Sequence, residues 1–167
     1  MLRGGGGQPR LAALFEVRVP RRLFRSEHAD LVPALAALYG FFQHVPQLLL
    51  LTQAAAQQFV GTHDFLALCA AGSSAAAHGD TVRTITDCHV TRRGDEIDIE
   101  VTADGYLYNM VRILAGTLCE VGAGRMQPEQ IPGILAGCDR SQAGPTLPAK
   151  GLFLKCVEYP DMKENHS

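Results

Sequence analysis

The chain has 167 residues, 47% of them hydrophobic, which suits one domain with a proper core and excludes a disordered chain. Its net charge of −2 excludes a whole-chain basic field, so any surface that binds nucleic acid must come from local clusters. The five cysteines are scattered without a CxxC spacing, which favours a reduced, cytoplasmic protein and argues against a metal site.

Residues 1–45 show no sustained period and stay unassigned. They are rich in arginine and include a run of four glycines. The best strand candidate, Leu14 to Val19, is interrupted by Arg18 and followed at once by Pro20. A helix over residues 31–42 is conceivable despite the proline within it. We expect this segment to be a basic, solvated or aberrant arm.

Helical signals become consistent after residue 46. Residues 52–60 are rich in Ala and Gln and predict a helix that Gly61 ends. Residues 65–71 predict a further helical turn, and residues 72–79 predict a loop. In the segment 61–65, a His-Asp pair is expected to cap backbone groups rather than to catalyse.

Two strands follow, joined by a tight turn. Residues 81–92 predict a strand with imperfect alternation. Residues 97–103 alternate cleanly between apolar and polar side chains, so one face is expected to be buried and the other wet. Arg93, Gly94 and Asp95 suit the hairpin turn between them.

The next element is an amphipathic helix that Gly122 and Gly124 end. Its apolar stripe recurs at steps of three and four residues: Leu107, Met110, Val111, Leu114, Leu118 and Val121. Pro128 can open a second helix, which Pro132 should kink or delay.

A final strand is expected over residues 152–159, followed by a polar tail over residues 161–167. The order strand, strand, helix, helix, strand predicts an α+β fold, with an antiparallel sheet and helices packed on one face.

Arg112 is the residue whose purpose most needs an explanation, because a cation among apolar residues is costly unless an anion meets it. It lies off the apolar stripe, on a face shared with small residues such as Ala115 and Gly116. Small residues there let another backbone approach closely. One interpretation is a cleft wall that holds an anion. The other is a surface arginine that pairs with a nearby carboxylate.

Three further cations are candidates for contacting RNA, namely Arg83, Arg140 and Lys150. Lys150 precedes a glycine, where the backbone can make close contacts that a Cβ would obstruct. A solvated loop lysine explains the same pattern equally well.

Several segments together resemble TruA-type tRNA pseudouridine synthases over residues 46–160. These segments are FVGTHDF (59–65), VRTI (82–85), MVR (110–112), GTLCEVG (116–122), DRSQAGPT (139–146) and PAKGLFL (148–154). Each is weak alone, but their order and spacing together are family-like. The resemblance implies the fold of the family's C-terminal domain.

The resemblance also implies a reaction, the isomerisation of uridine to pseudouridine in the anticodon stem-loop of tRNA, without cofactor or metal. In the family the arginine of MVR pairs with a nucleophilic aspartate, and this role carries over to Arg112. Leu152 corresponds to the leucine that packs against the active centre. Family members are homodimers, so a homodimer is expected.

The aspartate-bearing Arg-Thr-Asp-x-Gly motif of the family is not found, since the only Arg-Thr, at Arg83, is followed by Ile85. The expected outcome is a C-terminal half that is inactive alone. Asp64, Asp87 and Asp139 are weak substitutes for the nucleophile. The alternatives are a non-catalytic module for RNA binding or dimerisation, and a purely structural α+β domain.

Overall fold

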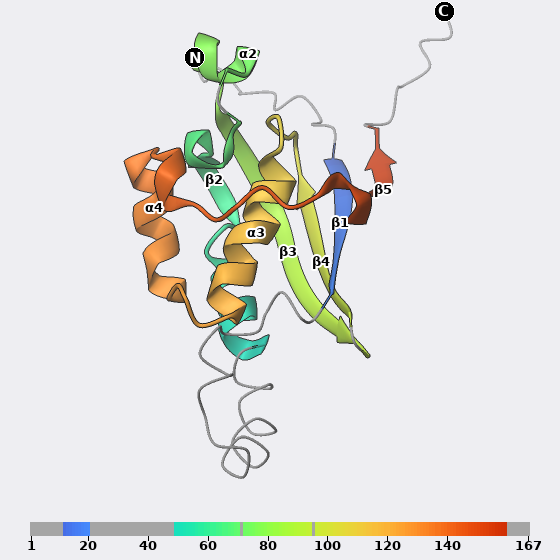
Figure 1. The fold of residues 1–167 in the computed structure, drawn as a ribbon. Helices are drawn as coiled ribbons and strands as arrows, with labels where there is room; N and C mark the ends of the chain where they lie inside the picture. Colours follow the sequence, from blue (N-terminus) through green and yellow to red (C-terminus); the bar gives the residue numbers. More distant parts are fainter. Residues whose placement is uncertain (1–11, 21–48, 71, 95, 160–167) are drawn as a thin grey trace, which may run out of the picture.

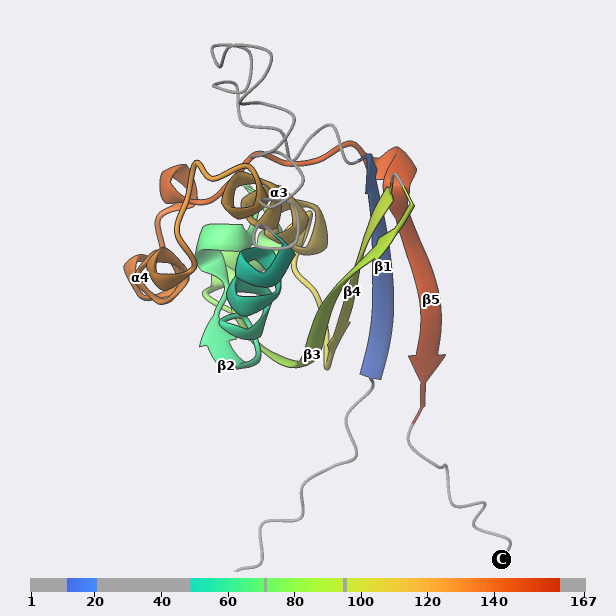
Figure 2. The same ribbon diagram turned by 90° about the horizontal axis from the view of Figure 1, so that it is seen from below.

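The computed structural model describes residues 12–20, 49–70, 72–94 and 96–159. Five strands form one antiparallel sheet in the order β2-β3-β4-β1-β5. The helices cover one face of this sheet (Figures 1 and 2). This arrangement confirms the predicted α+β fold.

The centre of the sheet is the predicted hairpin of β3 (Val82–Arg93) and β4 (Glu96–Ala103). Gly94 occupies the left-handed region in the turn, with φ of 63°. A shift of register between Ile85 and Asp87 marks a β-bulge in β3. The bulge explains the imperfect alternation of this strand, because one extra residue reverses the face on which later side chains lie.

Strand β1 (Ala12–Pro20) lies between β4 and β5 (Leu152–Glu158). The interpretation that Arg18 interrupts the strand candidate is therefore wrong. Arg18 is exposed on the sheet face away from the helices and lies opposite Asp98 of β4. The helix considered over residues 31–42 lies outside the described residues.

Residues 49–57 are helical, so the helix expected over 52–60 lies a few residues earlier. Gly61 does not end it but begins β2 (Gly61–Asp64), with φ of 122°. The helical turn expected after it is confirmed as η3 (Leu66–Leu68).

The predicted loop over residues 72–79 is partly wrong, because it contains the short helix α2 (Ser74–His78). The side chain of Ser73 accepts a hydrogen bond from the Ala76 backbone and caps this helix. Gly79 ends it in the left-handed conformation.

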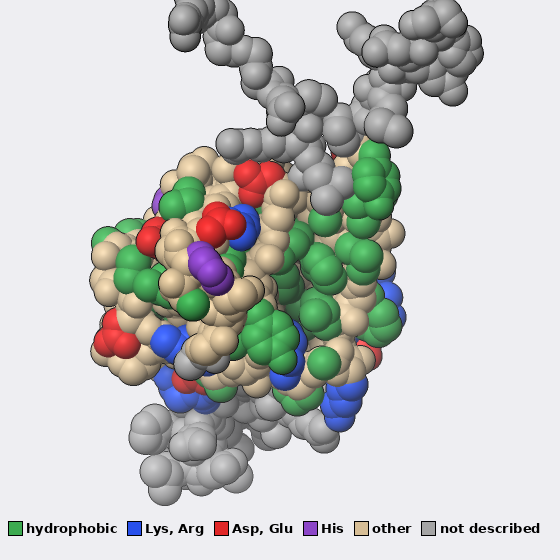
Figure 3. Space-filling model, turned by 90° about the horizontal axis from the view of Figure 1, so that it is seen from above, with side chains coloured by type: hydrophobic (Ala, Val, Ile, Leu, Met, Phe, Trp, Pro, Cys, Tyr) green, Lys and Arg blue, Asp and Glu red, His purple; other side chains and the backbone are tan. Residues whose placement is uncertain are grey.

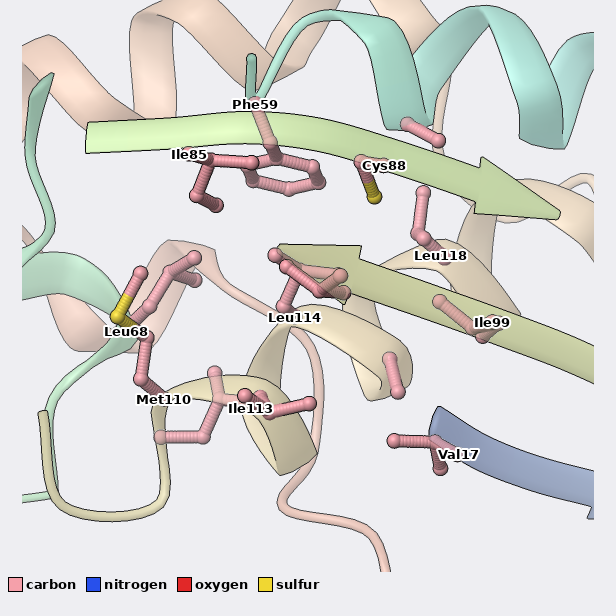
Figure 4. Close-up of a cluster of buried hydrophobic side chains, with 14 of the residues drawn as sticks. Val17, Phe59, Leu68, Ile85, Cys88, Ile99, Met110, Ile113, Leu114 and Leu118 are labelled. Atoms are coloured by element: carbon pink, nitrogen blue, oxygen red, sulfur yellow. The ribbon is translucent and has the colours of Figure 1, made fainter. Parts of the chain in front are cut away.

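Helix α3 (Met110–Gly122) packs on the centre of the sheet. Its Leu114 and Leu118 meet Ile99 of β4 and Phe59 in the core (Figure 4). The next helix begins late, as predicted: η4 (Pro128–Gln130) precedes α4 (Ile131–Gly137), and Pro132 falls in the first turn of α4, where its missing N–H costs nothing.

Candidate functional site

Helix α3 is enclosed on almost every side. Within it, only Arg112 and Glu120 are not buried. Glu120 pairs with Arg125 at 2.6 Å, and this contact lowers the pKa of the Glu120 carboxyl. Arg112 is therefore a half-buried cation on a largely apolar helix, and its contacts decide what it can do.

A loop over residues 138–151 crosses α3 on its way to β5 (Figure 1). A Cβ on Gly116 would lie 1.8 Å from the Pro145 carbonyl oxygen, which leaves room only for glycine. A Cβ on Gly144 would lie 2.5 Å from the Thr117 backbone nitrogen. The Gly144 N–H donates to the buried Thr117 hydroxyl at 2.9 Å. The expectation that small residues beside Arg112 admit a second backbone is confirmed.

This loop also holds Arg112. Its Nε donates to the Leu147 carbonyl oxygen at 2.5 Å, and its Nη1 donates to Asn109 Oδ1 at 2.7 Å. The Leu147 N–H donates back to the Arg112 carbonyl oxygen at 3.3 Å. Two neutral acceptors thus fix the plane of the guanidinium, and Nη2 has no partner among the described residues.

No carboxylate lies within ion-pair distance of Arg112 in the described part of the chain. The interpretation of Arg112 as an arginine paired with a local surface carboxylate is therefore wrong for these residues. A guanidinium held by neutral oxygens keeps its full charge, and its remaining donors suit the two oxygens of a carboxylate or phosphate.

Asn109 begins α3 in the left-handed conformation, with φ of 62°. This conformation is costly for a residue other than glycine and is tolerated best by Asn and Asp. The hydrogen bond from Arg112 to the Asn109 side chain helps to hold it. Asn109 and Arg112 therefore position one another.

Leu152 begins β5 opposite Val17, on the sheet face that carries α3. It is half-buried and packs against the core, and Leu154 continues the same face with 56% of its surface exposed. Figure 3 shows hydrophobic side chains gathered in a band on the side of the molecule formed by β1 and β5. Leu152 thus lies at the base of an apolar surface, reached by the same loop that holds Arg112.

The three other predicted site residues are distributed unevenly. Arg140 and Lys150 lie on the crossing loop, the same loop that contacts Arg112 through Leu147 and leads into β5. Arg140 donates to neutral oxygens of Ala143 and Thr146, and Lys150 is exposed. Arg83 lies on β3, away from this loop, and pairs with Asp80 at 3.0 Å.

The weak substitutes for a nucleophile are all engaged locally. Asp64 Oδ1 accepts from the Leu66 N–H at 2.9 Å, which confirms that this His-Asp segment caps backbone groups. Asp139 accepts from the Ser141 N–H at 2.8 Å, and this bond lowers the pKa of its carboxyl. Asp87 pairs with His89 at 2.9 Å. None of them contacts Arg112.

The opposite face of the sheet carries an ion-pair cluster that sequence reasoning missed. Glu16 of β1 lies 2.8 Å from Arg18 and 3.1 Å from Lys155, and the hydrogen bond from Arg18 lowers the pKa of its carboxyl. Asp98 is 1% exposed and lies 2.8 Å from Arg93. The available signal was the alternate spacing of the charges, Glu16 and Arg18 on β1 and Glu96, Asp98 and Glu100 on β4, but their partners become clear only when the two strands are known to be neighbours.

The described ranges contain neither a cluster of metal ligands nor a membrane-spanning helix. No three His, Cys, Asp or Glu side chains there are grouped so as to hold a metal ion. No helix there has the length and apolar character needed to cross a bilayer.

Comparison with known proteins gives this geometry a context. Residues 55–160 match the family model described as tRNA pseudouridine synthase. The tRNA pseudouridine synthase A of Acetivibrio thermocellus is 49% identical over 107 residues, which cover 64% of this chain and 43% of the relative. That of Caldicellulosiruptor saccharolyticus is 44% identical over 126 residues, 74% of this chain and 50% of the relative.

The tRNA pseudouridine synthase A of Moorella thermoacetica is 50% identical over 105 residues, which cover 63% of this chain and 42% of the relative. The chain therefore spans about half the length of the curated relatives it matches. The matched segment contains α3, the crossing loop and β5, and with them the whole setting of Arg112. The chain belongs to the tRNA pseudouridine synthase family.

Proposed function

We propose that this chain supplies Arg112 and Leu152 to the active site of a tRNA pseudouridine synthase that acts on the anticodon stem-loop. One observation carries the proposal: the half-buried guanidinium of Arg112 is fixed by Leu147 O and Asn109 Oδ1, neither of which neutralises it. A cation held in this way can bind an anion that comes from outside the described residues. Residues 46–160 together with strand β1 (Ala12–Pro20), which joins β5 to the rest of the sheet, are the proposed functional domain, in a cytoplasmic protein.

The reaction needs no cofactor. A carboxylate attacks C1′ as the bond between C1′ and N1 of uracil breaks, the freed uracil turns, and its C5 then bonds to C1′ and displaces the carboxylate, which leaves unchanged. The proton on C5 is then lost and N1 gains one, so atoms and electrons balance. In this scheme Arg112 keeps the attacking carboxylate ionised and aimed, because a nearby cation favours the charged form. Leu152 packs against the reacting centre.

Binding of tRNA requires phosphate contacts as well. Arg140 and Lys150 lie on the same loop as the contact to Arg112, and neither is paired with a carboxylate among the described residues. Cations of this kind release counterions from RNA, so binding should weaken as salt rises. We propose that these two residues and Arg83 contact the tRNA backbone.

The test measures binding and turnover separately. The purified chain is mixed with an anticodon stem-loop that carries tritium on C5 of uridine, and both affinity and tritium release are followed over a range of salt. We expect salt-sensitive binding that Arg112→Ala weakens, with no release from this chain alone. The proposal would be overturned if the chain did not bind the stem-loop. It would also be overturned if the Arg112→Ala variant bound as tightly as the unaltered chain but melted at a lower temperature.

A second candidate is a non-catalytic module for RNA binding or dimerisation on the same scaffold. The observation that favours it is that Asp64, Asp87 and Asp139 are all engaged locally and none contacts Arg112. Release of tritium by the chain alone would exclude this candidate. Binding without release, even after a fragment with the family's aspartate motif is added, would support it.

A further inference from the structure

Tyr108 presents an aromatic ring to solvent directly before α3. Tyr108 is 68% exposed, whereas Leu107 and Met110 on either side are 5% and 1% exposed. The ring between these two buried anchors is therefore open to a partner, and tyrosine rings are enriched at such interfaces.

The backbone that carries Tyr108 is held on both sides. Its carbonyl oxygen accepts from the Ala70 N–H at 3.0 Å. The next residue, Asn109, is locked in the left-handed conformation, with its side chain bound to Arg112 at 2.7 Å. The backbone of residues 105–109, the segment before α3, is therefore held in place. A ring on such a backbone loses less entropy when it binds a partner.

An arginine lies near each end of the segment 105–109. At its start, the Cδ of Arg83 lies 3.4 Å from where a Cβ on Gly105 would be. At its end, Arg112 holds Asn109 and keeps its own charge unneutralised among the described residues. Arg83 is paired with Asp80, whereas Arg112, four residues after Tyr108, has no carboxylate partner among the described residues. An exposed aromatic ring near such a cation is a combination that binds single-stranded nucleic acids, because bases stack on the ring and phosphates meet the cation.

We infer that Tyr108 is a stacking platform for an unpaired RNA base next to the Arg112 site. This inference rests on the proposed function and deepens it, since it names an unpaired base as the part of the RNA that Tyr108 contacts. A base that leaves its stack to reach an active site loses stacking energy, and a neighbouring aromatic ring restores part of it. A protein partner would instead favour an apolar ring surrounded by further apolar residues.

The experiment compares three variants on two RNAs. Tyr108→Ala removes the ring, Tyr108→Phe keeps it, and Tyr159→Ala is the matched control, because Tyr159 is 76% exposed but lies after β5. The RNAs are an anticodon stem-loop with 2-aminopurine in the loop and a duplex of equal length. We expect Tyr108→Ala to bind the stem-loop about 10-fold more weakly and to lose the stacking quench, with no change on the duplex.

Tyr108→Phe and Tyr159→Ala should bind within about 2-fold of the unaltered chain. Equal stem-loop binding by Tyr108→Ala, or an equal loss on both RNAs, overturns the stacking role and leaves the proposed function standing. Failure of the unaltered chain to bind either RNA overturns both. A change in sedimentation of Tyr108→Ala, without a change in RNA affinity, would assign the ring to a second copy of the chain and overturn the inference.

Discussion

The cations on the sheet face away from the helices differ from Arg112, on the helix-covered side, in the groups that hold them. On the face away from the helices, Arg18, Arg93 and Lys155 each lie within 3.1 Å of a carboxylate. On the helix-covered side, Arg112 is just as firmly held, but by a backbone carbonyl and a side-chain amide. The first arrangement balances charge inside the fold. The second fixes a cation without neutralising it.

The difference separates structural charges from available ones. A new anion near Arg18 would have to compete with Glu16, which already lies 2.8 Å away. An anion near Arg112 meets only neutral oxygens, so the full attraction of the guanidinium is available to it. Substitutions at the two kinds of cation should therefore have different effects on RNA affinity and on stability.

The largest effect on stability is expected for Gly116→Ala, which displaces the loop whose Leu147 carbonyl holds Arg112. The new Cβ would lie 1.8 Å from the Pro145 carbonyl oxygen, so the loop must move away from α3. We expect a loss of about 3 kcal/mol in the free energy of unfolding. Urea denaturation measures it.

Gly133→Ala is the matched control, because Gly133 lies within α4 and a Cβ there meets nothing within 4 Å. This change should raise the free energy of unfolding by about 0.5–1 kcal/mol, since alanine favours helix. If both variants were equally stable, the close crossing of loop and helix would be wrong.

The next effect is on RNA affinity. With no carboxylate on Arg112 among the described residues, its free donors can bind a phosphate of the RNA, and Arg112→Ala should weaken binding of the anticodon stem-loop by about 10-fold or more, since hydrogen bonds to a charged group contribute about 1.5–3 kcal/mol. Arg112→Lys keeps the charge but not the planar fork, and should restore only part of the affinity. Arg93→Ala, which removes a cation already paired with Asp98, should leave the affinity nearly unchanged. Equal losses for Arg93→Ala and Arg112→Ala would remove the contrast.

A smaller effect is expected for Glu16→Gln on the other face. Glu16 is 3% exposed, and its loss leaves Arg18 and Lys155 without this carboxylate. We expect the free energy of unfolding to fall by about 1–2 kcal/mol, less than for a fully buried pair because both cations reach solvent. RNA affinity should not change. A loss of affinity with unchanged stability would assign Glu16 to the binding site.

Part of that stability should depend on pH. The pKa of Glu16 is lowered below its ordinary value of 4.5, mainly by the hydrogen bond from Arg18. A carboxyl whose pKa is lower in the folded state than in the unfolded state stabilises the protein at any pH above its unfolded-state pKa. This stabilisation is lost as the pH falls through its folded-state pKa. Urea denaturation from neutral pH down to below 4.5 should therefore show a decrease that is shallower in Glu16→Gln. Parallel curves would contradict this assignment.

The smallest effect is expected for Arg125→Ala. Its pair with Glu120 is 2.6 Å long, but the Arg125 side chain is 38% exposed, and exposed pairs contribute little. We expect a loss of about 0.5 kcal/mol, measured by thermal melting. A loss as large as that for Glu16→Gln would show that exposure does not separate these pairs.

The sequence was enough to predict the elements whose signal is local. The hairpin of β3 and β4 follows from alternation, and α3 follows from its apolar stripe. Strand β1 was missed because Arg18 counts as an interruption until Asp98 is known to lie opposite it on another strand. The cap of α2 by Ser73 was available in the sequence but was outweighed by the surrounding Gly and Ser.

The candidate site divides in the same way. That Arg112 lies beside small residues which admit a second backbone was predictable from the sequence, and the active-site role proposed for it comes from the resemblance. Its actual partner is a carbonyl 35 residues along the chain, and backbone acceptors leave no trace in residue type. The neutral surroundings of Arg112 therefore had to come from the structure.

The central claim is that Arg112 is fixed yet still available to an anion. Nitrogen NMR of the arginine side chains, recorded while acetate is added, tests it most directly, with the Arg112 signals assigned by their loss in Arg112→Lys. We predict that the Nη signals of Arg112 shift and saturate, while those of Arg18 and Arg93 stay unchanged. No shift at Arg112, or an equal shift at all three arginines, would contradict the claim.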